Sequence, residues 1–289
     1  MTIDSFDIAG RISQLWVFPI KSCAGISLQS ARLLPTGLEH DRAFMLVDAQ
    51  GTFITQRDMP RMALIQPALA GAELGVTAPG MPALQIDMAF DGPQRLVRVW
   101  DDCVEALQAP AAINAWFSQF LQTDCTLVRM APKARRLASH KWTGGVDAPT
   151  QFADGYPLLV ISQASVDALN DRLQQAGHAP IVAQRFRAGL IVDGVEAHDE
   201  DRVERLTVLQ GAEQSLALPL VKPCARCPIP DIDPATAESG HRVMDTLQTY
   251  RHDDRLDGAV TFGMNAIVPP GVSGVLRVGD AVGANLQFG

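Results

Sequence analysis

Residues 43–55 read AFMLVDAQGTFIT, two apolar runs separated by a short polar stretch. The first run, residues 43–47, is apolar throughout, and Asp48 to Gly51 has the composition of a turn. Residues 52–55 then continue with β-branched and aromatic side chains. The pattern predicts a β-hairpin whose loop is somewhat longer than the tightest type.

Similar short runs, punctuated by glycine and proline, continue along the chain in both directions from this hairpin. They predict strands at residues 11–20, 63–65, 84–86, 95–100, 125–130, 158–161, 189–192, 206–209, 215–221 and 275–278. Short strands at such spacing are typical of barrels and sandwiches. The sequence therefore predicts an α+β chain that is predominantly β.

Helical periodicity is limited to a few segments. Between residues 113 and 121, apolar side chains recur at helical spacing and form one stripe. A second stripe, Val166, Leu169 and Leu173, follows Ser162, whose side chain is a good N-cap. The first helix follows the strand-rich part, so we expect a soft domain boundary near residues 100–125.

Composition excludes some classes of function. The formal net charge of −8 makes nucleic acid an unexpected main partner, because phosphate backbones require clustered positive charge. No run of about 18 apolar residues is present, so we expect no membrane span, and the first residues do not resemble a secretory signal. Five cysteines, an odd count, favour free thiols and a cytoplasmic location.

Two of these cysteines lie close together in residues 222–234, KPCARCPIPDIDP. A redox dithiol would open a helix, which Pro228 and Pro230 oppose. A structural zinc site needs about four ligands, and there is no second CxxC motif. Positive charge beside a thiol favours thiolate, the form that binds soft metals, and Cys224 lies between Lys222 and Arg226. From these residues alone, two interpretations of Cys224 remain equally open, namely that it is a single metal ligand or that it is simply a buried thiol.

Longer stretches resemble a known family. LWVFPIKSCAGISL (15–28), GLEHDRAFMLVD (37–48) and TQRDMPRMALI (55–65) resemble the N-terminal β-barrel module that precedes MOSC domains. Six later stretches resemble the MOSC domain itself. They are FADGYPLLVISQASVDALN (152–170), RFRAGLIVDG (185–194), PCARCPIPDIDPATA (223–237), LQTYR (247–251), FGMNAIV (262–268) and GVLRVGDAV (274–282). The chain is most similar to the amidoxime-reducing branch of this family.

The resemblance implies an N-terminal β-barrel-like module, residues 1–115, packed on a MOSC β-barrel domain with a few helices, residues 116–289. It also implies a molybdenum cofactor, Mo-molybdopterin, bound between them. By their matched positions, Cys224 would be the molybdenum ligand, and Asp233 would face the metal or fix its loop. The matched cofactor-binding residues are Lys21, Ser22, Arg42, Asp154 and Arg187.

The resemblance implies that a basic segment, residues 129–142, corresponds to a loop that lies over the cofactor in the family. An equally open interpretation is that this segment is a basic loop exposed to solvent. A loop carrying Arg135, Arg136 and Lys141 would close on the anionic pterin phosphate or gate the substrate, and the two arginines are the candidates for binding the cofactor. Two departures, Gly189 where asparagine is usual and Met264 where glutamine is common, leave the substrate open.

The resemblance implies a molybdenum-dependent oxidoreductase that reduces N-hydroxylated or N-oxide compounds. No cysteine follows Cys227, so we expect no plant-type iron–sulfur cluster in this chain. Electrons would come from a separate ferredoxin, flavoprotein or cytochrome, and the other partner would be a small-molecule substrate. Two alternatives are a sulfur carrier that uses a Cys224 persulfide and a molybdopterin carrier without catalytic activity.

Overall fold

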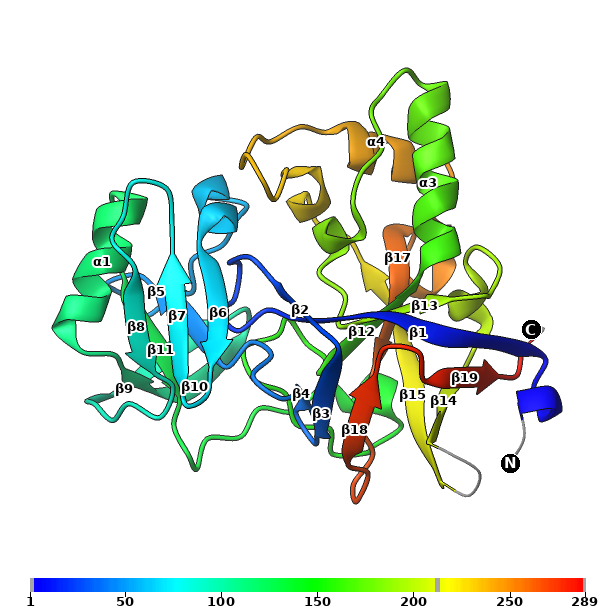
Figure 1. Ribbon diagram of the computed structural model, residues 1–289, viewed down its shortest axis with the longest axis horizontal. Coiled ribbons are helices and arrows are strands. Elements are labelled where there is room, and N and C mark those ends of the chain that lie inside the picture. Colours follow the sequence, from blue (N-terminus) through cyan, green and yellow to red (C-terminus); the bar gives the residue numbers. More distant parts are fainter. Residues whose placement is uncertain (1–2, 211–213, 288–289) are drawn as a thin grey trace.

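The computed structural model describes residues 3–210 and 214–287 and confirms a chain made mostly of strands. Figure 1 shows two lobes side by side, with residues 44–130 in one and most of the remaining chain in the other. The described residues contain four α-helices, none of which has the length and apolar character that a membrane crossing requires.

The larger lobe is a closed barrel of seven strands. In order around the barrel these are β12 (Leu158–Ser162), β13 (Leu190–Asp193), β1 (Ile8–Val17), β19 (Ala281–Ala284), β14 (Arg205–Gln210), β15 (Gln214–Ala225) and β17 (Ala259–Ala266). Pairing of β12 with β17 closes the ring. Inside it, Leu15, Val160, Leu190, Leu218 and Met264 belong to one buried apolar cluster, which is the main core of this lobe.

The first residues of the chain therefore lie in the barrel. Strand β1 pairs with β13 on one side and β19 on the other, between strands that come much later in the sequence. Beside the barrel, β2 (Ile26–Leu28) pairs with β1, and β3 (Ser30–Leu34) pairs with both β4 (Gly37–Leu38) and β18 (Gly274–Arg277). The chain then crosses into the second lobe.

The second lobe contains two small sheets. One has the order β5 (Phe44–Val47), β11 (Thr126–Met130), β10 (Asp102–Gln108) and β9 (Gln94–Val99), and the other joins β6 (Gln66–Ala70), β7 (Glu73–Thr77) and β8 (Leu84–Asp87). The hairpin predicted at residues 43–55 is confirmed, because Val47 pairs antiparallel with Phe53. Helix α1 (Ala111–Leu121) buries the predicted apolar stripe against this lobe.

Helices cover one end of the barrel (Figure 1), namely α3 (Gln163–Gln175) and α4 (Arg242–Gln248). Ser162 caps α3 as predicted, since its Oγ accepts a hydrogen bond from the Ser165 N–H at 3.0 Å. The remaining short elements are α2 (His140–Thr143), β16 (His252–Asp253) and the 3₁₀ turns η1 (Ile3–Ser5), η2 (Pro60–Leu64), η3 (Ala183–Phe186), η4 (Asp199–Arg202), η5 (Ile229–Asp231) and η6 (Asp254–Leu256).

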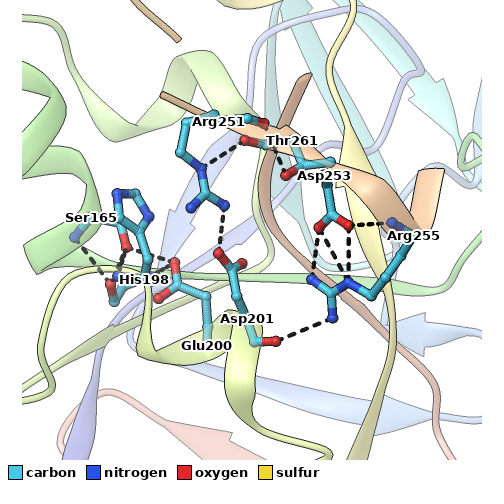
Figure 2. A network of polar contacts seen from close by, with 9 residues as sticks. Ser165, His198, Glu200, Asp201, Arg251, Asp253, Arg255 and Thr261 are labelled. Carbon is cyan, nitrogen blue, oxygen red and sulfur yellow. Dashed lines mark hydrogen bonds and ion pairs between the residues drawn. The ribbon is translucent and has the colours of Figure 1, made fainter. Parts of the chain in front are cut away.

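A polar network joins the start of α3 to η4 and to the end of the barrel (Figure 2). Glu200 accepts hydrogen bonds from the Ser162 N–H at 3.1 Å and the Ser165 hydroxyl at 2.8 Å, and its burial raises the pKa of its carboxyl group. Asp201 pairs with Arg251, which also donates to the Thr261 carbonyl. These contacts hold α3 and η4 against β17.

The closure of the barrel gives a stability prediction at Gly263, which has φ +77° in β17. A Cβ there would lie 2.5 Å from Ile161 Cγ2 and 2.7 Å from the Val160 carbonyl oxygen. Gly258 has the same φ, but a Cβ there would meet nothing within 4 Å. Urea unfolding should show that Gly258→Ala lowers the free energy of unfolding by about 1 kcal/mol. Gly263→Ala should cost at least about 2 kcal/mol more because of overpacking, and equal losses would contradict this account.

Candidate functional site

A cavity lies in the larger lobe, beside the segments that lead into the second lobe. Its volume is about 110 Å³. The predicted residues Lys21, Ser22, Arg42, Asp154, Arg187 and Cys224 all line it. They come from five separate segments of the sequence, and the fold brings together side chains that the motifs had suggested one by one. Tyr156, Arg226, Cys227 and Asn265 complete the polar part of the lining.

Cys224 lies near the end of β15, which continues through Ala225 and is therefore longer than predicted. Its register against β17 shifts between Pro223 and Ala225. The Cys224 Sγ is half-buried and accepts a hydrogen bond from Arg226 Nη1 at 3.1 Å. The same guanidinium donates to the Phe186 carbonyl at 3.2 Å, which fixes its position. Cys227 is also half-buried, and both thiols are free.

Arg42 and Arg187 lie on the ring of Phe18, with their guanidinium carbons 4.6 and 4.3 Å from its centroid. Arg42 Nη2 donates to the Arg187 carbonyl at 2.8 Å, and Arg187 Nη1 donates to the Cys23 carbonyl at 2.7 Å. Arg187 Nη2 is buried and has no partner among the described residues. Burial and, to a smaller extent, the neighbouring Arg42 lower the pKa of Arg187 to about 9.

Lys21 is buried, and its ammonium group donates to the Phe152 carbonyl at 2.9 Å and to the Asp154 carboxylate. Burial lowers the pKa of Lys21, although the ion pair with Asp154 acts in the opposite direction. Trp100, from the second lobe, donates its indole N–H to the same carboxylate at 3.0 Å. Asp154 is thus held by a cation of the first segment and by an aromatic side chain of the other lobe.

Three residues of the lining have left-handed backbone conformations, which are uncommon outside glycine. They are Ser22, with φ 67°, Arg42, with φ 50°, and Arg187, with φ 58°. Such strained conformations persist only when surrounding contacts fix them, and they cluster at binding sites. The conformation of Arg187 follows the end of η3, where its N–H bonds to the Gln184 carbonyl.

The charges of the lining are unbalanced. Lys21, Arg42, Arg187 and Arg226 line the cavity, whereas Asp154 is its one carboxylate among the described residues. Lys21 pairs with Asp154 and Arg42 with Asp41, outside the lining, so Arg187 and Arg226 are the two cations without a carboxylate partner in the described chain. Clustered buried cations with an unpartnered guanidinium nitrogen favour an anionic ligand. The thiol of Cys224 adds one soft donor atom to the same wall. This combination suits a polyanion that also carries a soft metal.

The other predicted residues lie outside the lining. Asp233 pairs with Arg185 at 2.7 Å, and its other oxygen accepts the backbone N–H groups of Ala235 and Thr236. It therefore fixes the loop after η5. No part of the basic segment 129–142 belongs to the lining of this cavity as the structure describes it.

Arg135 and Arg136 face in different directions. Arg135 is exposed and lies 3.7 Å from the Asp147 carboxylate. Arg136 is buried, donates to the Asp102 carboxylate at 2.6 Å, and also donates to the backbone carbonyls of Gln151, Ala153 and Asp154. Arg136 thus holds the segment that carries Asp154 in position at the cavity.

Some contacts at the site carried no usable signal in the sequence. Trp100 has φ 55° and is partly exposed beside Asp154, but neither feature can be recognised from neighbouring residues. Phe18 lies within a stretch that resembles the family, yet its position between two guanidinium groups depends on Arg187, far along the chain.

Two family models match the chain, in the order expected from its motifs. Residues 9–124 match the MOSC N-terminal beta barrel domain, and residues 147–283 match the MOSC domain. The mitochondrial amidoxime-reducing component 1 of Mus musculus is 28% identical, and the alignment covers 94% of this chain and 82% of that protein. Molybdenum cofactor sulfurase of Danio rerio is also 28% identical over 88% of this chain, but only 31% of its own length. The YUAD protein from Bacillus subtilis, a solved structure, aligns with 95% of this chain and 94% of its own at 11% identity and a TM-score of 0.41.

The two neighbouring arginines provide a matched pair of variants. Arg136→Ala should lower the free energy of unfolding by about 3 kcal/mol, because it leaves a carboxylate and several carbonyl groups without their donor. Arg135→Ala should change it by less than about 0.5 kcal/mol, since that side chain is exposed. Urea titrations followed by tryptophan fluorescence test this, and a similar loss in both variants would refute the positioning role of Arg136.

Proposed function

This chain belongs to the MOSC family, and on that premise we propose that it binds a molybdenum cofactor in the cavity lined by Cys224 and reduces N-hydroxylated compounds. The observation that carries the proposal is the cavity lining itself, in which two thiols, Cys224 and Cys227, lie among four cationic side chains. The names of its relatives support the same chemistry, since they include amidoxime-reducing components and a molybdenum cofactor sulfurase.

The residues present fit the cofactor. A molybdopterin carries a phosphate and a dithiolene, which are anionic, and its metal accepts a soft thiolate donor. Arg187 Nη2, buried without a partner among the described residues, can donate to such a group without giving up an existing hydrogen bond. Lys21 and Arg42 are held by carboxylate, carbonyl and aromatic contacts, so little side-chain entropy remains to be lost on binding.

Each residue then has a defined role. Cys224 would hold the molybdenum, and Arg226 would orient the Cys224 thiol through the 3.1 Å contact. Lys21, Ser22, Arg42 and Arg187 would bind the anionic parts of the cofactor, and Asp154 would keep Lys21 in place. When bound, the cofactor supplies two-electron redox chemistry, in which an N-hydroxylated compound, two electrons and two protons give the amine and water.

Two other predicted residues support the site from outside its lining. Asp233 would act by holding Arg185 and its loop, and Arg136 by holding the Asp154 segment. Electrons would come from a separate donor protein. All five cysteines are free, which supports a reducing compartment such as the cytoplasm.

The two cysteines of the lining give the direct test. The chain and its Cys224→Ser and Cys227→Ser variants should be produced in a host that makes the cofactor, then assayed for molybdenum, pterin fluorescence and benzamidoxime reduction with a supplied donor. Cys224→Ser should lower the rate of benzamidoxime reduction more than about 100-fold. Mutation of residues that only hydrogen-bond to metal ligands already lowers metal affinity or activity about 10–100-fold, and loss of the ligand itself should cost more. Cys227→Ser is the matched control, and it should lose much less of this activity.

The same preparations separate the competing functions. Full activity in Cys224→Ser would refute the ligand assignment. Protein without molybdenum or pterin, but with the mass of one extra sulfur atom on Cys224, would replace the proposal with sulfur transfer. Bound cofactor that turns over no N-hydroxylated compound or N-oxide would replace it with a carrier function.

A further inference from the structure

A second hollow of about 280 Å³ lies between the two lobes and shares wall residues with the cofactor cavity. Arg187 and Ile229 line both. The second hollow, here called the lobe groove, has a mainly apolar wall formed by Trp16, Phe18, Ala63, Val182, Ile229 and Ile232. Its volume approaches that of common small-molecule sites, and an apolar wall with few polar groups is typical of them.

One polar group in the lobe groove is unusual. Gln56 is only 5% exposed and lines the groove, yet its side-chain amide has no hydrogen-bond partner among the described residues. Its position is fixed by the turn around it, because the Thr55 hydroxyl accepts the Arg57 N–H at 3.1 Å and donates to the Asp58 carboxylate at 3.0 Å. A buried amide is normally paired, so its donors and acceptor are available to a ligand.

The arginines of the groove already have partners for part of their guanidinium groups, and one nitrogen of each, Arg185 Nε and Arg187 Nη2, is buried without a partner among the described residues. Arg185 donates to the Pro230 carbonyl at 3.1 Å and to the Asp233 carboxylate at 2.7 Å, which neutralises much of its charge. Arg187 contacts the ring of Phe18 and the Cys23 carbonyl. The groove therefore offers apolar surface together with the neutral amides of Gln56, Gln66 and Gln184. These features match a molecule that has an apolar body and a few polar atoms better than a small inorganic anion.

At the rim of the groove, Val182 is 50% exposed, one of few large apolar side chains so exposed in the described chain. A ligand in the groove would cover it and gain apolar contact. Because Arg187 and Ile229 belong to both walls, a molecule in the groove lies next to the cofactor cavity.

We propose that the lobe groove is the substrate subsite that binds the aromatic or aliphatic body of an N-hydroxylated compound, with the Gln56 amide hydrogen-bonding to a polar atom of that body. This inference rests on the proposed function, since it names where that reaction's substrate is held. It makes Gln56 and Val182 determinants of substrate preference that do not touch the cofactor.

Two variants test the groove without altering the cofactor cavity. Val182→Trp fills the groove from its exposed rim, and Gln56→Leu removes the amide at similar volume. Leu96→Trp is the matched control, because Leu96 is 63% exposed and lies outside the linings of both hollows. Molybdenum and pterin contents should equal those of the unmodified protein in all three.

The assay compares benzamidoxime, which has an aromatic body, with hydroxylamine, which has none. Val182→Trp and Gln56→Leu should each raise KM for benzamidoxime about 10-fold or more, with kcat/KM for hydroxylamine unchanged. Leu96→Trp should alter neither. Saturation-transfer NMR of benzamidoxime with the same proteins gives a binding readout that does not depend on turnover, and its signal should weaken in the two groove variants alone.

The outcomes separate this proposal from the proposed function. Turnover of benzamidoxime with unchanged KM and NMR signal in both groove variants would overturn the subsite and leave the reaction intact. An equal loss for both substrates, or a loss of molybdenum, would also overturn it, because the variants would then act on the cofactor cavity. NMR binding that depends on Gln56 and Val182, without turnover of either substrate, would support the groove and reject the reaction.

Discussion

The guanidinium groups of Arg42 and Arg187 lie against the ring of the same side chain, Phe18, at a place where the two lobes meet. Two like charges so close together in a partly dry site repel each other and lose hydration. The stacked ring and the carbonyls of Cys23 and Arg187 offset part of this cost. One nitrogen of Arg187 remains without a partner among the described residues. Arg42 is paired with the buried carboxylate of Asp41, so Arg187 is the member of this pair that has no carboxylate partner among the described residues. The cavity is therefore arranged around the charge of Arg187.

The barrel makes this arrangement possible because β1 belongs to it. Strand β1 is fixed between β13 and β19 and ends at Val17, immediately before Phe18. The next residues lead out of the barrel toward the second lobe, with the Lys21 N–H bonded to the Phe44 carbonyl at 2.8 Å. One continuous segment thus contributes to the larger core, to the cavity wall and to the other lobe. The relative position of the lobes is consequently linked to the geometry of the site.

The sequence was most informative where short motifs coincide with the ends of strands. Short sequence motifs identified five segments, which contain Lys21, Arg42, Asp154, Arg187 and Cys224. The fold brings these residues to one cavity. The predominantly β class and the hairpin at residues 43–55 also followed from local patterns, because apolar runs and turn residues act over short distances.

Features that depend on long-range packing could not be predicted in this way. Arg135 and Arg136 are chemically identical neighbours, and only the tertiary fold decides that one is exposed and the other holds the carbonyls around Asp154. Gln56 has no distinctive context in the sequence, and its unpaired amide follows from the meeting of two lobes. At Arg187, burial and Arg42 lower the pKa to about 9, so the group is still charged at neutral pH but at a cost to the folded state. An anion in the cavity would raise that pKa again and remove the cost, so the same side chains that disfavour the empty site stabilise the occupied one.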